Sequence, residues 1–247
     1  MSGQVLSSLH DIVSAEHPTY ISGGTDIMPL LKNEVRDDKD FVFLKKIPEL
    51  HVLEEKDGEL IIGAAMTLTE LAESELLNSR YAAIAQASSL TASPQIRNIA
   101  TVGGNIMQDR RCIYFNQPHL WRSGLACHEH LPILVTRFLV PAAEEGERSG
   151  FYKYAMRTTI DFPIINFALR CGGNRPARLA AGAVAPHPVV MAETAAKIDS
   201  DATDDEVIAQ AEDELRKLAM PIKEACMTPA VKRSLYRHVA MLLDLRK

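Results

Sequence analysis

Two glycine pairs, each followed by small polar residues, constrain this sequence more than any other feature. Gly23-Gly24 follows Tyr20-Ile-Ser22 and precedes Thr25, and Gly103-Gly104 follows Thr101-Val102 and precedes Asn105. Glycine adopts positive φ angles at no steric cost and lets another group approach the backbone closely. Successive backbone N–H groups in a tight turn form an anion-binding nest. We therefore expect the two loops to grip the two phosphates of a dinucleotide.

The glycine pairs alone are also compatible with two ordinary turns, because Gly-Gly is common in turns. Neither pair lies in a Gly-x-Gly-x-x-Gly fingerprint, so a Rossmann-type dinucleotide site is not indicated. The sequence also lacks a P-loop, a His-Glu-x-x-His motif and a Gly-x-Ser-x-Gly elbow. Self-contained hydrolase chemistry is therefore not indicated.

The composition predicts a globular chain. It has 247 residues, of which 47% are hydrophobic, enough to bury a core. The net charge of -5 argues against a nucleic-acid partner. We expect no membrane span and a cytoplasmic location, because no run of 18 apolar residues occurs and the N-terminus lacks a basic, apolar leader. The four cysteines are too few for a disulfide framework and predict reduced thiols or metal ligands.

Periodicity and turn signals predict an α+β fold. Asp57-Gly58 predicts the tight turn of a hairpin over residues 52–62. Thr67 with Glu70, and Thr203 with Glu206, form capping boxes that predict two helix starts. Four strands are expected in the second half, at residues 133–140, 150–156, 163–171 and 179–184.

The order and spacing of several motifs resemble the FAD-binding subunit of the molybdenum hydroxylase (xanthine oxidase) family. These motifs are the two glycine loops, Lys32, Gln95-Ile-Arg-Asn98, Phe151-Tyr-Lys153-Tyr and Asp161-Phe-Pro163. The resemblance covers most of the chain. It implies an FAD-binding domain of the PCMH/vanillyl-alcohol-oxidase type, followed by a three-stranded sheet with helices of the CO dehydrogenase flavoprotein C-terminal type. We expect these domains at residues 1–130 and 131–247, with a cysteine-containing loop at 106–130.

The resemblance implies FAD as the cofactor and assigns residues to it, but no catalytic residue. The FAD-binding residues would be Ser22, Gly23, Gly24, Thr25, Asp26, Ile27, Thr101, Val102, Gly103, Gly104, Asn105 and Lys153. A carboxylate repels phosphate, so we expect Asp26 to orient its loop or to bond a flavin hydroxyl. Lys153 matches a family lysine near the flavin; its alternative role is that of a solvated strand lysine.

Residues 106–130 lack periodicity and gather Cys112, Cys127, three histidines and the only tryptophan. Thiolate and imidazole bind iron–sulfur clusters or zinc; the alternative is an aromatic loop with buried thiols. Arg111-Cys112 and Trp121-Arg122 resemble the 4-hydroxybenzoyl-CoA reductase branch of the family, in which four cysteines bind a 4Fe-4S cluster. On that resemblance Cys112 and Cys127 are 4Fe-4S ligands, although the loop supplies only two of the four thiolates.

The resemblance also implies partners: a large molybdopterin subunit and a small subunit with 2Fe-2S clusters, as a dimer of heterotrimers. The chain would pass electrons between those clusters and ferredoxin or another carrier, as a 4-hydroxybenzoyl-CoA reductase-like enzyme. The alternative is the flavin subunit of an ordinary xanthine, aldehyde or CO dehydrogenase. Two alternatives from other classes remain: a stand-alone flavin reductase and a non-flavin, zinc-binding adaptor.

Overall fold

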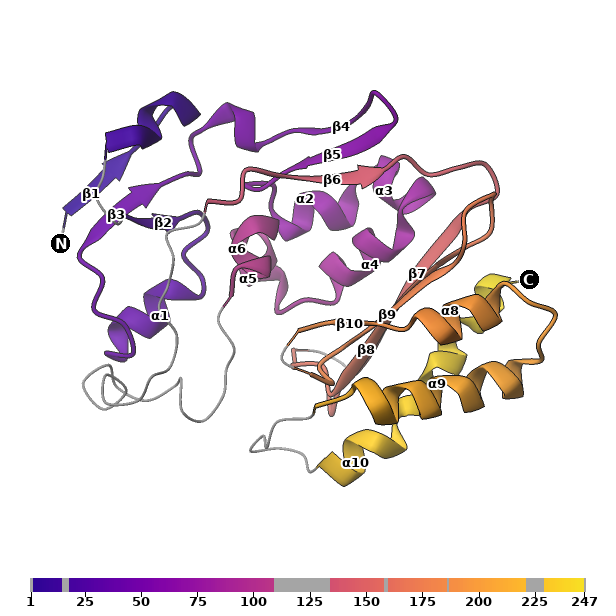
Figure 1. The fold of residues 1–247 in the computed structure, drawn as a ribbon. Helices are drawn as coiled ribbons and strands as arrows, with labels where there is room; N and C mark the ends of the chain where they lie inside the picture. The colour runs from indigo at the N-terminus through magenta and orange to yellow at the C-terminus, as the bar shows by residue number, and fades with distance from the viewer. Residues whose placement is uncertain are drawn as a thin grey trace. The chain divides into compact units, whose positions relative to one another are not determined.

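The computed structural model describes residues 2–14, 18–108, 134–157, 160–185, 187–220 and 229–246 (Figure 1). The chain divides into two compact units. The first unit comprises Met1–Glu70 and Pro94–Ala142, and the second unit comprises Leu71–Ser93 and Ala143–Lys247. This division differs from the expected single boundary after residue 130, because residues 71–93 pack in the second unit and residues 134–142 in the first.

The first unit contains two small sheets. In the parallel sheet β1 (Ser2–Val5) and β2 (Thr19–Ile21) flank β3 (Asp40–Phe43). In the antiparallel sheet β4 (Leu53–Lys56) and β6 (Arg137–Pro141) flank β5 (Glu59–Gly63). The short helices of this unit are η1 (Leu9–Ser14), α1 (Ile27–Lys32), η2 (Pro48–Leu50), α5 (Pro94–Arg97) and α6 (Val102–Ile106), and α2 (Leu68–Glu73) begins in this unit and ends in the second.

Local signals explain where several of these elements begin and end. The predicted hairpin turn at Asp57-Gly58 is confirmed: both residues have positive φ, of 53° and 81°, as a primed two-residue turn requires. Leu60 and Ile62 of β5 are buried and alternate with the more exposed Ile61. This is the two-residue period of a strand with one face on the core.

The capping box before α2 is also confirmed, and it lies beside the second glycine loop. The Glu70 carboxylate accepts from the Thr67 backbone N–H and from Thr67 Oγ1, both at 2.7 Å. Burial acts to raise the pKa of Glu70, but these two hydrogen bonds and the charges of His51 and Lys45 together outweigh it and hold the pKa below its usual value. Thr67 also forms an isolated antiparallel bridge with Thr101, so the cap helps to fix the segment that leads into α6.

The second unit contains an antiparallel sheet of four strands in the order β10-β9-β8-β7. Its strands are β7 (Arg148–Tyr154), β8 (Ile165–Cys171), β9 (Arg178–Gly182) and β10 (Val189–Val190). The expected sheet had three strands; β10 adds a fourth of only two residues, too short to show an alternating pattern. The helices of this unit are α3 (Glu75–Arg80), α4 (Ala82–Ser89), α8 (Ala192–Ile198), α9 (Asp204–Leu218), α10 (Pro229–Ser234) and η3 (Tyr236–Arg246).

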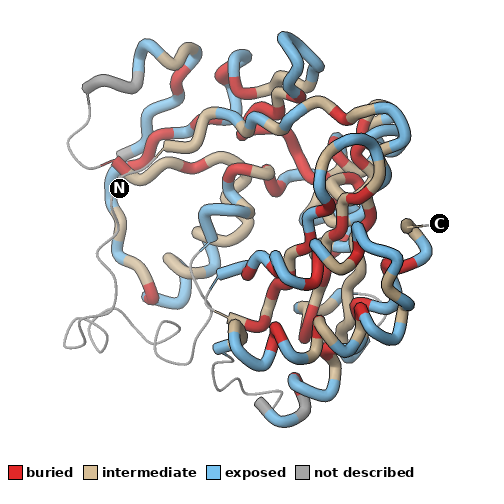
Figure 2. The backbone as a smooth tube through the Cα atoms, turned by 45° about the vertical axis from the view of Figure 1, so that its right-hand side comes forward, coloured by how far each residue is buried: buried red, intermediate tan, exposed pale blue. Residues whose placement is uncertain are grey.

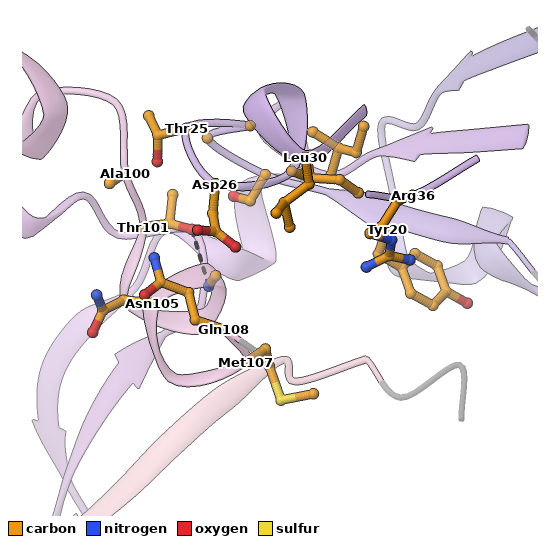
Figure 3. Close-up of a pocket in the computed structure, with 16 residues that line it drawn as sticks. Tyr20, Thr25, Asp26, Leu30, Arg36, Ala100, Thr101, Asn105, Met107 and Gln108 are labelled. Atoms are coloured by element: carbon orange, nitrogen blue, oxygen red, sulfur yellow. Dashed lines mark hydrogen bonds between the residues drawn. The ribbon is translucent and has the colours of Figure 1, made fainter. Parts of the chain in front are cut away.

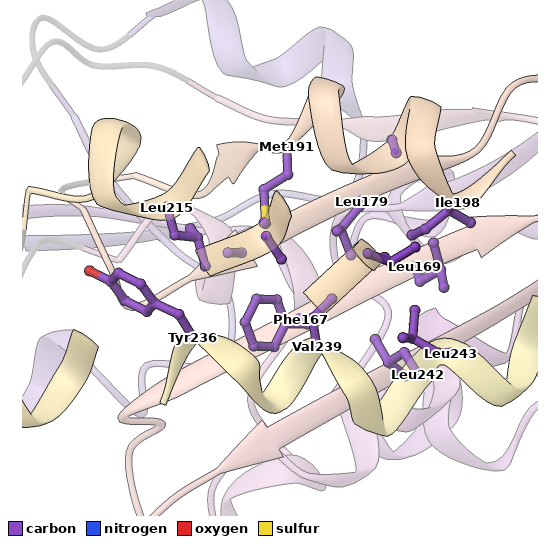
Figure 4. Packing of buried hydrophobic residues seen from close by; sticks show 14 of the residues in the cluster. Phe167, Leu169, Leu179, Met191, Ile198, Leu215, Tyr236, Val239, Leu242 and Leu243 are labelled. Carbon is purple, nitrogen blue, oxygen red and sulfur yellow. The ribbon is translucent and has the colours of Figure 1, made fainter. Parts of the chain in front are cut away.

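One face of this sheet forms the core of the second unit. Buried residues alternate with partly exposed ones along the whole of β8 (Figure 2). Phe167 of β8 packs in one cluster with Leu215 of α9 and Val239 of η3 (Figure 4). The predicted capping box at the start of α9 is confirmed, with Thr203 and Glu206 bonding each other reciprocally. In the described part of the chain, no helix combines the length and apolar character needed to cross a membrane.

Candidate functional site

The two glycine loops line one cavity of about 140 Å³ in the first unit (Figure 3). The first loop contributes all six of its predicted residues, Ser22 to Ile27, and the second contributes Thr101, Gly104 and Asn105. Gly103 lines an adjacent cavity, and Val102 lines neither. The structure thus brings together most of the residues predicted to bind the cofactor, and Lys153 lies in the second unit.

Gly23 lets the two loops touch backbone to backbone. A Cβ atom at this position would lie 2.3 Å from the Ile99 carbonyl oxygen and 3.0 Å from Ala100 Cα. Both distances are shorter than van der Waals contact, and both atoms belong to the main chain, which cannot swing aside as a side chain can. Glycine is therefore required here for packing, which is a different reason from the φ angle of a turn.

The other glycines of the site serve different purposes. Gly24 has φ of +69°, in the left-handed region that glycine adopts without cost. A Cβ on Gly103 would lie 2.8 Å from Ala64 Cβ and 2.8 Å from the Ala64 carbonyl oxygen. The Gly103 backbone N–H donates to that same oxygen at 2.9 Å. Gly103 thus seats α6 directly on the end of the β5 segment.

The backbone N–H groups of the second loop are engaged within the protein. Those of Val102 and Gly103 donate to the carbonyls of Met66 and Ala64, and that of Asn105 donates to the Thr101 carbonyl. The Gly104 N–H donates to Thr101 Oγ1 at 3.3 Å, which caps α6. In this conformation the second loop therefore shapes the cavity and offers the Asn105 side chain, while its N–H groups are occupied.

The first loop differs from the second in that several of its backbone N–H groups have no acceptor among the described residues. Within the described residues, the backbone N–H groups of Gly23, Gly24 and Thr25 donate to no acceptor. Ser22 Oγ is likewise buried without a hydrogen-bond partner among the described residues. Buried polar atoms are normally paired, so the unpaired Ser22 oxygen points to a missing partner at this loop. Successive free N–H groups and a hydroxyl suit the oxygens of a diphosphate, and the chemistry of this loop fits the diphosphate of FAD.

Arg36 is a residue of the cavity that the sequence analysis missed. It is the only basic side chain among the described residues that line the cavity. Its Nε and Nη2 donate to the two carboxylate oxygens of Asp38 at 2.6 and 2.5 Å, and Thr19 Oγ1 donates to Asp38 Oδ1 at 2.5 Å. Burial acts to raise the pKa of Asp38, but these hydrogen bonds and the Arg36 charge outweigh it and lower the pKa.

The Asp38 carboxylate thus holds Arg36 in one orientation, and Arg36 and Tyr20 both line the cavity (Figure 3). Nothing in the sequence distinguishes Arg36, because all residues from 34 to 40 except Val35 are charged. Tyr20, Met107 and Gln108 also line the cavity and were likewise not predicted. Asp26, expected to orient its loop, is the N-cap residue of α1 but makes no side-chain capping hydrogen bond.

Lys153 is tied to two carbonyl groups of the second unit. Its Nζ donates to the Leu90 oxygen at 2.8 Å and to the Asp161 oxygen at 2.6 Å. The Asp161 carboxylate in turn accepts from the backbone N–H groups of Arg157 and Phe162. Lys153 therefore anchors the segment after β7 to the end of α4, which is not the environment of a fully solvated strand lysine.

The predicted cluster ligands Cys112 and Cys127 lie outside the described residues. Among the residues that are described, no group of three or more His, Cys, Asp or Glu side chains could hold a metal ion. Cys171 is a buried free cysteine, and burial raises the pKa of its thiol. Cys171 is therefore an unreactive thiol in the core of the second unit.

Known proteins resemble this chain in sequence and in fold. Residues 3–210 match the model for the FAD binding domain in molybdopterin dehydrogenase. The xanthine dehydrogenase FAD-binding subunit of Escherichia coli O157:H7 is 32% identical over 197 residues, covering 68% of each chain. The aldehyde oxidoreductase FAD-binding subunit of Escherichia coli K12 is 36% identical over 117 residues, covering 46% of this chain and 34% of the relative.

Two solved structures show the same fold at low identity. Carbon monoxide dehydrogenase from Hydrogenophaga pseudoflava has a TM-score of 0.80 at 19% identity, covering 96% of this chain and 93% of the other. Quinoline 2-oxidoreductase from Pseudomonas putida 86 has a TM-score of 0.77 at 18% identity, covering 99% and 95%. With the family match over residues 3–210, the chain belongs to the family of FAD-binding domains of molybdopterin dehydrogenases.

Proposed function

We propose that this chain binds FAD and serves as the electron-transfer subunit of a multi-subunit molybdenum-dependent oxidoreductase. The observation that carries this proposal is the first glycine loop, where three backbone N–H groups and a buried hydroxyl have no acceptor among the described residues. A diphosphate supplies such acceptors. FAD, when bound, supplies the one- and two-electron chemistry, and the protein supplies its position and electrostatics.

Four residues of the cavity are proposed to hold the cofactor: Gly23, Gly24, Thr25 and Arg36. The N–H groups of Gly23, Gly24 and Thr25 would donate to the diphosphate oxygens. Gly23 also keeps this loop against residues 99–100 of the second loop. Arg36, fixed by Asp38, offsets the negative charge of the diphosphate at the edge of the cavity. None of these residues takes part in bond making or breaking.

The remaining parts of the enzyme are proposed to lie in partner subunits. The E. coli relative is named as one subunit of a xanthine dehydrogenase, which supports a large molybdopterin subunit and a small 2Fe-2S subunit here. We propose a dimer of such heterotrimers in the cytoplasm, with ferredoxin or another carrier as the external electron partner. The substrate of the molybdenum centre is then selected by the large subunit.

The cofactor can be tested on the purified chain. We expect the isolated chain, after removal of bound flavin and reconstitution, to take up about one FAD and to show flavin absorbance. The measurement is titration of the apo chain with FAD, followed by flavin fluorescence and by release of flavin on denaturation. A folded chain that takes up no FAD, alone or in its native complex, would contradict the proposal, and stoichiometric zinc instead would favour the adaptor.

A 4-hydroxybenzoyl-CoA reductase-like subunit with a 4Fe-4S cluster is the second candidate, because Cys112 and Cys127 lie in an aperiodic, aromatic stretch. If this candidate is right, the native complex contains about four irons beyond those of the 2Fe-2S clusters. Cys112→Ser should then remove that iron, whereas Cys171→Ser, at a buried thiol of the second core, should retain it. Equal iron in both variants and no excess over the 2Fe-2S clusters would instead indicate an ordinary hydroxylase flavin subunit.

A further inference from the structure

The outer edge of β6, in the antiparallel sheet of the first unit, faces no other described strand. β6 pairs with β5 and forms the margin of the sheet opposite to β4 (Figure 1). The Ala142 N–H donates to the Gly58 carbonyl, and the Ala64 N–H donates to the Thr136 carbonyl, both at 2.9 Å. Bonded and non-bonded residue pairs alternate along two antiparallel strands. The even-numbered residues of β6 therefore bond to β5, and the odd-numbered ones direct their backbone groups to the outer edge.

Arg137 and Leu139 thus present two N–H groups and two carbonyl groups on that edge. In the described part of the chain, neither residue makes a hydrogen bond or an ion pair beyond its pairing with β5. Pro141 has no N–H to offer and ends the open stretch. β6 therefore carries a short row of backbone donors and acceptors to which another extended segment can add.

Apolar side chains beside this edge are incompletely buried. Leu139 is 52% exposed, on the face of the sheet that it shares with Ile61. Phe138 and Val140 lie on the other face, and both are partly exposed although Leu60, opposite Val140, is 0% exposed. A further strand beside β6 would cover apolar surface on both faces of the sheet, and burial of such surface favours the addition.

The two edges of this sheet differ in charge. β4 carries Glu54, Glu55 and Lys56 at exposed positions, and charged side chains on an edge strand oppose pairing with another strand. β6 carries a single charge, that of Arg137, and this side chain has no acidic partner within the described ranges. An acidic residue opposite Arg137 in an added strand would form a favourable cross-strand pair. The β6 edge is therefore the one that favours strand addition.

We propose that the outer edge of β6 receives an extended segment of a partner subunit as a fourth strand, with apolar residues beside Leu139 and an acidic residue beside Arg137. This inference rests on the proposed function and adds to it one contact surface of the complex. Strand addition takes its affinity from main-chain hydrogen bonds. An edge of five residues buries far less than the roughly 1,200 Å² of a stable interface. It therefore favours a segment of a subunit that is also held elsewhere over a second copy joined here alone.

Residue-resolved hydrogen exchange tests the added strand directly. In the isolated chain we expect slow exchange at the amides of Phe138 and Val140, which bond to β5, and fast exchange at those of Arg137 and Leu139. In the complex co-purified with its partner subunits, the Arg137 and Leu139 amides should slow by about tenfold or more. A general stabilisation of the sheet would instead slow all four amides together.

Variants at the edge test the side-chain chemistry. Leu139→Lys adds a charge to the edge and should reduce recovery of the chain in that complex by about tenfold. Arg137→Glu should reduce it as well, whereas Arg137→Lys, which keeps the charge, should not. Glu54→Lys is the matched control, because Glu54 is exposed on the same face at the opposite edge. The isolated variants should melt close to the unaltered chain, since all three side chains are exposed.

The inference is overturned if the Arg137 and Leu139 amides exchange equally in the complex and in the isolated chain, or if Glu54→Lys lowers recovery as much as Leu139→Lys. Slow exchange of both amides in the isolated chain would also overturn it. If that slow exchange is independent of concentration, a segment of this chain covers the edge; if it appears as concentration rises, a second copy does. A chain that joins no molybdenum or iron–sulfur subunit would overturn the proposed function, and this inference with it.

Discussion

Gly23→Ala is expected to weaken FAD binding by roughly 100-fold, because a single added methyl group forces the two loops of the site apart. That methyl group would lie 2.3 Å from the Ile99 carbonyl oxygen and 3.0 Å from Ala100 Cα. Neither atom can move without displacing the main chain that leads into Thr101. Titration of the apo chain with FAD measures the loss, and urea denaturation should show about 1–3 kcal/mol of lost stability from the same clash.

Two other glycine variants separate this clash from backbone strain. Gly58→Ala places a side chain at φ of +81° with nothing within 4 Å, in a hairpin turn outside the cavity. We expect it to cost about 1 kcal/mol of stability and to leave FAD affinity unchanged. Gly24→Ala places a methyl group at φ of +69°, 3.4 Å from Met28 Cγ. Its FAD affinity should lie between those of Gly23→Ala and Gly58→Ala. Unchanged FAD affinity in a folded Gly23→Ala protein would show that FAD does not depend on the contact between these loops.

The features that the sequence predicted well are those encoded by a few neighbouring residues. Asp57-Gly58 defines a turn through the φ angles that it tolerates, and each capping box needs only a threonine and a glutamate three residues later. The two glycine loops were found for the same reason. Residues of both loops line one cavity in the first unit, and the binding of FAD there stays a prediction.

The features that the sequence did not predict depend on contacts between distant residues. Arg36 is held at the cavity by Asp38, whose carboxylate also accepts a hydrogen bond from Thr19, and no periodicity marks that arrangement. β6 pairs with β5, with Val140 opposite Leu60, so a strand placed in the second half by order along the chain belongs to the first unit. The separate tasks of the two loops depend on which N–H groups find an acceptor, and that is decided only in the folded chain.

Glu214 is another such residue. In the sequence it is one of three consecutive acidic residues of α9 and suggests only a solvated helix face. In the structure it is 4% exposed and reaches the N-terminus of α8. Its Oε1 accepts from the Glu193 backbone N–H at 3.0 Å, and its Oε2 accepts from the Thr194 N–H at 2.7 Å and from Thr194 Oγ1 at 2.6 Å.

Glu214→Ala is therefore expected to destabilise the second unit by about 3–5 kcal/mol, because it removes three hydrogen bonds to a charged group, each worth about 1.5–3 kcal/mol, and at the same time removes a carboxylate that was costly to bury. The N-cap residue of α8, Met191, has no side-chain acceptor, so α9 supplies the cap that α8 lacks. Removal of the carboxylate leaves two backbone N–H groups and the Thr194 hydroxyl without their hydrogen-bond acceptor. Urea denaturation measures the loss, and hydrogen exchange should show faster exchange at the amides of Glu193 and Thr194.

Glu193→Gln is the matched control, because Glu193 is also acidic but carries a 60% exposed side chain paired with Lys217 at 3.8 Å. An exposed pair of this kind contributes about 0–1 kcal/mol, so this variant should be close to the unaltered chain. Glu214→Gln, which keeps one acceptor oxygen, should lie between Glu193→Gln and Glu214→Ala. Equal stability of all three variants would mean that water caps the N-terminus of α8 as effectively as the Glu214 carboxylate does. The expected order, with faster exchange confined to the start of α8 in Glu214→Gln, would show that one carboxylate joins the two helices packed on the sheet of the second unit.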